Sequence, residues 1–317
     1  MLEHASHDTE AVTAPRVIAL FGPTAVGKTA VGIALANALR AAGSDPVAVS
    51  ADALQVYAGL EVLSGVASPA ERAALEHRLV SCVPIDARFS VAEYAELAHA
   101  EIDGLLASGR LPLVIGGTGL YLRAALTELR LRPPPAEGVR ERWEQELLAR
   151  GVEALHAELA RRAPWAAERI DPRDRHRVVR GLELYDLGEL EQPGEESQLW
   201  TADVRHPTRL IGLCMEREAL YARIHQRIAE MLEAGVVDEV RAAHAAGASE
   251  TARQAVGFTE LLAGDVETME RRTRNLVRRQ MTWMRKLASV ELVDVTDKAP
   301  DEVADNLLAR EPWPAHH

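Results

Sequence analysis

Short apolar runs alternate with stretches that carry apolar residues at helical spacing along most of the chain. The runs are rich in Val, Ile and Leu, which is typical of strands that are buried on both faces. We therefore expect strands at Val17–Phe21, Val47–Ser50, Leu111–Ile115, Leu210–Met215 and Glu291–Val295.

Helical spacing marks several of the segments between these strands. Apolar residues recur three and four positions apart in Val91–Ser108 and in Leu220–Leu232, and a third helix is expected over Ala30–Leu39. Strands that alternate with helices predict the α/β class, with a mostly parallel sheet flanked by helices. Right-handed crossovers then bring the loops after the strands to the carboxyl edge of the sheet, where binding sites form.

The alternation breaks between about Arg132 and Pro207, where a triple proline, Pro133–Pro135, opens a passage of charged helical character. We interpret this passage as an inserted helical domain that contacts the substrate. The expected division is a flexible N-terminal tail over residues 1–15, a core over 16–131 and 208–317, and the insertion over 132–207.

Composition narrows the class of protein. The chain has 317 residues with 47% apolar content, enough for one large core or two unequal ones. No apolar run approaches the length of a membrane span, and residues 1–15 lack the pattern of a signal peptide, so we expect a cytoplasmic protein. Cys82 and Cys214 lie far apart, which favours small core residues over a disulfide or a zinc site.

The charge of the chain is unevenly distributed. A formal net charge of −12 argues against a protein that coats nucleic acid nonspecifically. However, seven arginines lie between Arg161 and Arg180, and Arg271–Val290 holds six arginines and Lys286 without an acid. Each run is either a solvated helix face or a surface that binds phosphates.

The first strand runs directly into a G-x-x-x-x-G-K-T motif, which a helix follows. In this context the backbone N–H groups and the helix N-terminus cradle phosphate oxygens, the lysine adds a point charge and the threonine hydroxyl can hold Mg²⁺. The motif predicts a ligand with at least a diphosphate. The expected diphosphate-binding residues of the loop are Gly22, Pro23, Thr24, Ala25, Val26, Gly27, Lys28 and Thr29, with Thr29 as the Mg²⁺ ligand.

Two further strands end at the same edge of the sheet. Asp52 follows the second strand, and from the sequence it is a magnesium ligand, a general base or a cap on the next turn. The strand Leu111–Ile115 ends in Gly116, where an NTP hydrolase usually has a magnesium-organising Asp. This weakens the interpretation as an NTP-driven motor and leaves small kinases open.

Taken together, the motifs resemble one family. They are Gly22–Thr29, the Ser50–Tyr57 stretch, His77–Leu79, Gly116–Tyr121, Arg177–Glu183 with its paired arginines, Ala255–Phe258 and Arg279–Trp283. In this order they resemble the tRNA dimethylallyltransferases, also called tRNA isopentenyltransferases, from about Val17 to Val295.

The resemblance implies a P-loop NTPase-like core and a Mg²⁺-dependent prenyltransferase. Such an enzyme moves a dimethylallyl group from dimethylallyl diphosphate to N6 of the adenosine just 3′ of the anticodon, in tRNAs that read U-starting codons. The partners would be the tRNA anticodon stem-loop and the diphosphate donor, with no obligate protein partner, so a monomer is expected. By resemblance, Asp52, Thr24 and Lys28 are catalytic, and Arg223 lies near the diphosphate.

The resemblance also implies contacts with tRNA. The matching positions are Asp52, Ala53, Leu54, Gln55, Thr118, His176, Arg177, Val178, Val179, Arg180, Arg253, Gln254, Ala255, Val256, Gly257 and Phe258. Gln55, Thr118 and Phe258 are the expected contacts with the base itself, because RNA loops are recognised by stacking and hydrogen bonds to splayed bases.

Two positions depart from the family pattern. Ala53 stands where the family usually has a serine, and Val66 stands where a lysine is expected near the substrate. Three alternatives remain open from the sequence: an enzyme that prenylates free adenylate, a small-molecule P-loop kinase, and a non-catalytic nucleotide-binding switch.

Overall fold

The computed structural model describes residues 15–132, 138–192 and 198–310. The described chain divides into two compact units. Of the described residues, those up to 129 and those from 199 onward form unit 1, and those within Arg130–Gln198 form unit 2. Residues 199–207, which we expected in the insertion, belong to unit 1. Residues 1–14 of the expected tail and the Pro133–Pro135 run lie outside the described residues.

Unit 1 is built on a six-stranded sheet in which every neighbouring pair is parallel, in the order β3-β2-β4-β1-β5-β6. The strands are β1 (Val17–Phe21), β2 (Pro46–Ser50), β3 (His77–Arg78), β4 (Leu111–Gly116), β5 (Thr208–Cys214) and β6 (Glu291–Asp294). The five predicted strands are confirmed. We missed β3 because two residues are too few to show a pattern.

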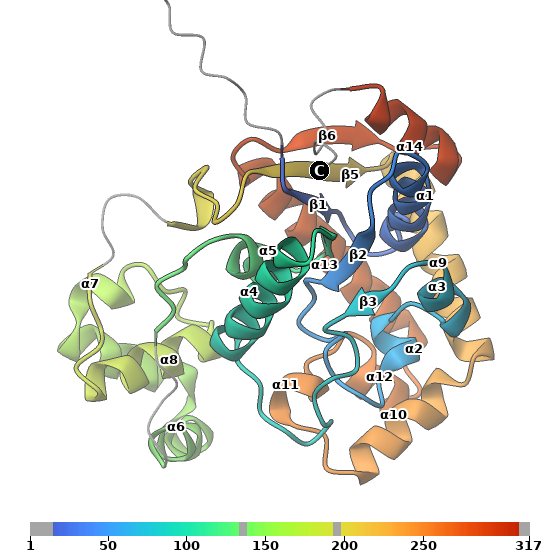
Figure 1. The fold of residues 1–317 in the computed structure, drawn as a ribbon. Helices are drawn as coiled ribbons and strands as arrows, with labels where there is room; N and C mark the ends of the chain where they lie inside the picture. The colour runs from blue at the N-terminus through green and yellow to red at the C-terminus, as the bar shows by residue number, and fades with distance from the viewer. Residues whose placement is uncertain (1–14, 133–137, 193–197, 311–317) are drawn as a thin grey trace, which may run out of the picture. The chain divides into compact units, whose positions relative to one another are not determined.

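Helices flank this sheet on both sides (Figure 1). In unit 1 they are α1 (Lys28–Ala41), α2 (Glu61–Ser64), α3 (Pro69–Ala74), α4 (Val91–Ala107), α5 (Gly119–Leu126), α9 (Arg217–Glu233), α10 (Val236–Ala245), α11 (Glu250–Arg253), α12 (Phe258–Ala263), α13 (Val266–Lys286) and α14 (Pro300–Leu308). α1 packs with α14, and α4 packs with α5. The α/β class with a parallel sheet is therefore confirmed.

The sheet places three loops at one edge. Every residue of β1 and β2 is buried, as the apolar runs predict. The loops after β1, β2 and β4 are joined by backbone bonds: Gly22 N–H donates to Gly116 O over 3.4 Å, and Ala51 N–H donates to Ile115 O over 2.8 Å. A Cβ at Gly116 would lie 2.1 Å from Ala51 O, so only glycine permits this approach.

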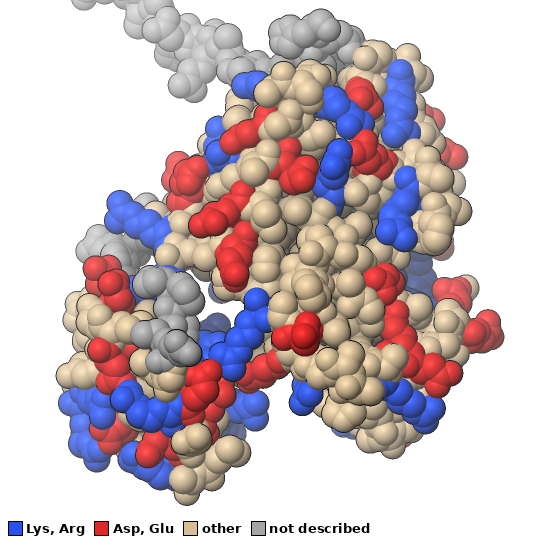
Figure 2. Space-filling model, turned by 60° about the horizontal axis from the view of Figure 1, so that its bottom comes forward, with Lys and Arg blue, Asp and Glu red and all other residues tan. Residues whose placement is uncertain are grey.

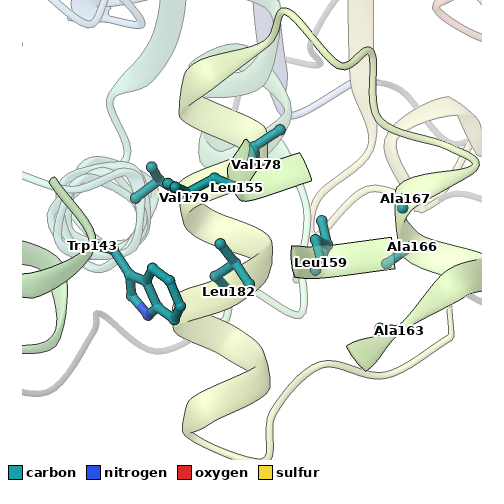
Figure 3. Packing of buried hydrophobic residues seen from close by; sticks show 9 residues of the cluster. All are labelled: Trp143, Leu155, Leu159, Ala163, Ala166, Ala167, Val178, Val179 and Leu182. Carbon is teal, nitrogen blue, oxygen red and sulfur yellow. The ribbon is translucent and has the colours of Figure 1, made fainter. Parts of the chain in front are cut away.

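Unit 2 has its own helices and its own apolar core. They are α6 (Val139–Arg162), which is interrupted at Gly151, α7 (Pro164–Ala167) and α8 (Arg175–Asp186). Figure 3 shows Val178, Val179 and Leu182 of α8 beside Leu155, Leu159 and Trp143 of α6. Closely packed apolar side chains of this kind are what holds a small helical unit together.

The surface mixes charges of both signs. Figure 2 shows basic and acidic side chains side by side across the face in view. Among the residues that the structure describes, no helix is both long and apolar enough to cross a membrane. The expectation that both cysteines are core residues is wrong, because Cys82 is exposed and Cys214 is only half-buried.

Candidate active site

The loop between β1 and α1 has the backbone of a phosphate cradle. Ala25 and Gly27 both have positive φ, of 65° and 98°, which bends the chain around a concave centre. Gly27 caps α1 without a side-chain hydrogen bond. The first N–H groups of a helix have no partner within the helix, so those of α1 remain available to an anion.

Lys28 stands at the base of this cradle. Its Nζ donates to the carbonyl oxygens of Gly22 and Pro23, over 3.0 and 2.9 Å. Burial of the ammonium group lowers the pKa of Lys28 to about 8, against a smaller upward effect of Asp52. An anionic ligand would favour the charged form, so the lysine is prepared to pair with a phosphate.

An arginine of α9 faces the same loop. The guanidinium of Arg223 lies 3.4 Å from the position that a Cβ on Gly27 would take. Arg223, Thr24 and Thr29 all line one cavity. The residues of the motif that do not line it are Gly22, Pro23 and Val26, which are buried beneath the loop.

Asp52 lines the same cavity as the cradle, on the loop that follows β2. Its Oδ1 accepts a hydrogen bond from Leu54 N–H over 3.0 Å, and its Oδ2 lies 3.4 Å from the Thr118 hydroxyl, which donates to it. Thr118 in turn accepts from Ala53 N–H at 3.5 Å. These bonds fix the carboxylate while both of its oxygens keep room for another partner.

Gln55 is held by both ends of its amide. Its Oε1 accepts from the Ser50 hydroxyl over 2.8 Å, and its Nε2 donates to Gly65 O over 3.0 Å. It lines the cavity together with Ala53 and Leu54. An amide fixed in this way presents its remaining donor and acceptor in one orientation, which suits the recognition of a base.

The sequence analysis missed Arg227, one helical turn after Arg223. Its guanidinium packs directly on Gly65, where a Cβ would lie 1.8 Å away from it, and it lines the cavity. Burial lowers the pKa of Arg227, and the nearby Asp52 opposes that effect. A cation therefore does reach the region where a lysine at Val66 was expected. The signal was available, since Arg223 and Arg227 are four residues apart on a predicted helix.

Gln280 is the second residue that we missed as part of the site. Its side chain is only 8% exposed and bonds to two loops of the sheet edge. It lies on the buried face of α13, between Val277 and Met284. A polar residue at helical spacing within an apolar face is the signal that could have identified it.

These side chains surround a cavity of about 690 Å³, a size typical of small-molecule sites. Its walls come from the phosphate loop, the loops after β2 and β4, α9 and α13. Ala255 and Val256 contribute to the wall as well. The arrangement joins a cationic cradle for phosphates to a fixed carboxylate, so it can hold an anionic leaving group and accept a proton.

Several expected tRNA contacts need correction. Val178 and Val179 are buried in the core of unit 2, where their side chains take part in packing rather than forming a surface. Phe258 is 1% exposed and packs edge-on to His244, with ring centroids 6.4 Å apart, so it is a core aromatic rather than a stacking surface. Gly257 is buried too.

The other predicted contacts lie on surfaces. Arg253 and Gln254 are exposed in unit 1, and His176 and Arg177 are exposed in unit 2. Arg177 pairs with Asp174, and Arg180 pairs with the fully buried Glu183 over 3.1 Å. Part of the positive charge of the first arginine cluster is thus used within unit 2.

Known proteins share this architecture. The family model described as IPP transferase matches residues 55–287. A tRNA dimethylallyltransferase of Kineococcus radiotolerans is 39% identical, covering 92% of this chain and 95% of that protein. One from Streptomyces coelicolor is 40% identical, covering 88% and 90%. The similarity confirms the resemblance drawn from the motifs.

A solved structure extends the likeness to the fold. The full-length tRNA isopentenylpyrophosphate transferase of Bacillus halodurans is 31% identical and superposes with a TM-score of 0.65. The match covers 93% of this chain and 96% of that one. The expected P-loop NTPase-like core is therefore confirmed.

Proposed function

This chain belongs to the IPP transferase family, and on that premise we propose that it transfers a dimethylallyl group from dimethylallyl diphosphate to N6 of the adenosine just 3′ of a tRNA anticodon. The single observation that carries the proposal is the cavity that holds Lys28 and Arg223 with a fixed Asp52. A diphosphate leaving group and an amine that must lose a proton need these two kinds of group in one cavity.

The cradle binds the diphosphate of the donor. Lys28 leaves the carbonyl oxygens that it now contacts and pairs with phosphate oxygens, together with the N-terminal N–H groups of α1. Arg223 and Arg227 add positive charge from α9. As the C–O bond of the donor breaks, its electron pair goes to the diphosphate, and these groups stabilise the charge that develops.

Asp52 acts on the acceptor. The N6 amine is a poor nucleophile because its lone pair is delocalised into the purine, so the loss of its proton must accompany the formation of the N6–C bond. The Asp52 carboxylate accepts that proton, and the bonds from Leu54 and Thr118 keep it aimed. The products are the N6-dimethylallyl adenosine, diphosphate and one proton.

To reach this carboxylate, the adenosine must be extruded from the stacked bases of the anticodon loop, which costs a few kcal/mol of stacking energy. Gln55, with both ends of its amide held, supports recognition of the extruded base. Contacts with phosphates of the anticodon stem-loop would offset the cost, with Arg253 and Gln254 in unit 1 as exposed candidates.

The residues of the cavity fit a Mg²⁺ ion that is held mainly by the substrate. The described residues contain no group of three or more His, Cys, Asp or Glu that could hold a metal, but Thr29 offers a hydroxyl beside the cradle. Mg²⁺ commonly binds through few protein groups and several phosphate oxygens. When bound, it would neutralise the charge of the diphosphate.

The test is transfer of radiolabelled dimethylallyl diphosphate, with Mg²⁺, to unmodified tRNA that reads U-starting codons, beside AMP and ATP as acceptors. We expect label in tRNA alone. Label in the nucleotide alone would place the enzyme among those that prenylate free adenylate, and a folded enzyme that labels nothing would contradict prenyl transfer altogether.

A further inference from the structure

We propose that Gln280 is a positioning residue that ties the donor loop to the acceptor loop and thereby aligns the two substrates. The inference rests on the proposed function. It concerns a single buried carboxamide that reaches the sheet edge from α13, a helix remote in sequence from both loops.

Both ends of the Gln280 amide are hydrogen-bonded, one to each loop, and we call this pair of bonds the bridge. Thr24 N–H, in the phosphate loop, donates to Gln280 Oε1 over 2.9 Å, and Gln280 Nε2 donates to Gly117 O over 2.9 Å. The two backbone partners fix which end of the amide is which, because one is a donor and the other an acceptor. Neither a carboxylate nor a hydrocarbon of the same length can serve both.

The loop after β4 is built to receive this side chain. A Cβ on Gly117 would lie 2.7 Å from Gln280 Nε2 and 3.4 Å from Lys28 Nζ. Glycine therefore allows the carboxamide and the catalytic lysine to approach the same backbone. The next residue is Thr118, whose hydroxyl donates to Asp52.

A short chain of contacts thus runs from the donor side to the general base: Thr24, Gln280, Gly117, Thr118 and Asp52. Transfer needs the acceptor nitrogen and the donor carbon within about 3–3.5 Å, and an error of about 1 Å can cost on the order of a hundredfold in rate. Gln280 touches neither reacting atom, so its effect should appear in turnover rather than in binding.

The experiment compares Gln280→Met, which fills the same space without either hydrogen bond, with Gln280→Glu, which keeps only the acceptor. Thr282→Val is the matched control, because Thr282 is an exposed residue of the same helix whose hydroxyl bonds only to the helix backbone at Arg278. Measured for each are kcat, the KM values for donor and tRNA, the Kd of the donor by calorimetry, and the unfolding temperature.

We expect kcat to fall about 10- to 100-fold in Gln280→Met and in Gln280→Glu. The donor Kd of Gln280→Met should stay within about threefold of the wild type, and Thr282→Val should resemble the wild type in every readout. A Gln280→Met enzyme with kcat within about twofold of the wild type would overturn the proposal, since the loops would then align without the bridge.

A parallel loss of donor affinity and unfolding temperature in Gln280→Met would also overturn it, by showing a merely structural role. Failure of the proposed function is distinguishable, because the wild type itself would then transfer no prenyl group to tRNA.

Discussion

At the scale of single residues, the ionisation of Lys28 sets a testable limit on donor binding. Its pKa of about 8 in the free protein means that the ammonium loses its proton just above neutral pH, while phosphate groups are already ionised there. Because the folded pKa lies below that of an ordinary lysine, rising pH removes the charge that attracts the diphosphate.

We expect the Kd for the donor to rise about tenfold per pH unit above about pH 8 in the wild type. Lys28→Met should bind the donor more weakly at pH 7 and lack this rise. Calorimetric titration with dimethylallyl diphosphate itself, in the absence of tRNA, between about pH 7 and 9.5 measures both. Equal slopes in the two proteins would assign the titration to another group.

Asp52 yields the second prediction at this scale. Asp52→Asn preserves the size of the side chain and an oxygen for Leu54 N–H, but it cannot take a proton from the amine. We expect kcat to fall by about 10²- to 10⁴-fold, the usual contribution of a general base. The Kd values for donor and tRNA should stay within about threefold. Loss of tRNA binding instead would make Asp52 primarily an RNA contact.

Lys28, Asp52 and Thr118 could be proposed from the sequence because the phosphate-loop motif fixes the place of Lys28, and the other two come just after the ends of β2 and β4. In the structure all three line one cavity. Gln280 and Arg227 could not be placed in the same way. Gln280 meets Thr24 across 256 positions of sequence, and only the folded arrangement of α13 on the sheet brings them together. For Arg227 the sequence offers the four-residue spacing to Arg223, but the close packing of its guanidinium on Gly65 is visible only in the folded protein.

At the scale of elements, α13 presents two different faces. Its buried face carries Gln280 among apolar residues, whereas Arg271, Arg278 and Arg285 are exposed at seven-residue spacing and so line up along the outside. Among the described residues, none of these three pairs with a carboxylate, unlike Arg272, which pairs with Glu260.

We therefore expect this outer face to contribute to RNA binding through phosphates. Arg278→Gln or Arg285→Gln should weaken tRNA binding and reduce the slope of log Kd against log salt by about 0.7 to 0.9 for each phosphate that the variant no longer neutralises. Arg241→Gln, an exposed arginine of α10 that already pairs with Asp238, is the charge-matched control. Filter binding over a salt series measures the slope, and equal slopes for Arg278→Gln and the control would assign α13 to a solvated face.

The lengths and apolar patterns of the strands and helices explain why part of the fold could be predicted from the sequence. β1, β2 and β4 are apolar over their whole length because both faces of a parallel sheet are covered by helices, so their sequence pattern is strong. The short α2, α3 and α11 have too few residues for a helical pattern to stand out. Ser68 caps α3 and Ser249 caps α11, so these two helices depend on their caps and on packing. Val178 and Val179 were misjudged because a motif match does not distinguish a buried position from a surface one.

At the scale of the whole molecule, we expect unit 1 to bind the donor and unit 2 to contribute to tRNA binding, and a single pair of variants can test this division. All the residues assigned to the donor belong to unit 1, while unit 2 has a separate core around Leu159 of α6, which is fully buried. Leu159→Ala removes buried methyl groups and should destabilise unit 2 by about 2–5 kcal/mol. Leu148→Ala changes the same residue type on the same helix at a position that is 88% exposed, so it should have almost no effect.

We expect Leu159→Ala to lower hydrogen-exchange protection across Arg130–Gln198 and to reduce kcat/KM for tRNA, because the inserted unit would no longer hold its expected RNA contacts in place. The donor Kd and the protection of the sheet should stay unchanged, since the cradle lies wholly in unit 1. A loss of donor affinity in step with the loss of unit 2 would mean that the two units fold as one, and unchanged tRNA kinetics would remove the insertion from tRNA recognition.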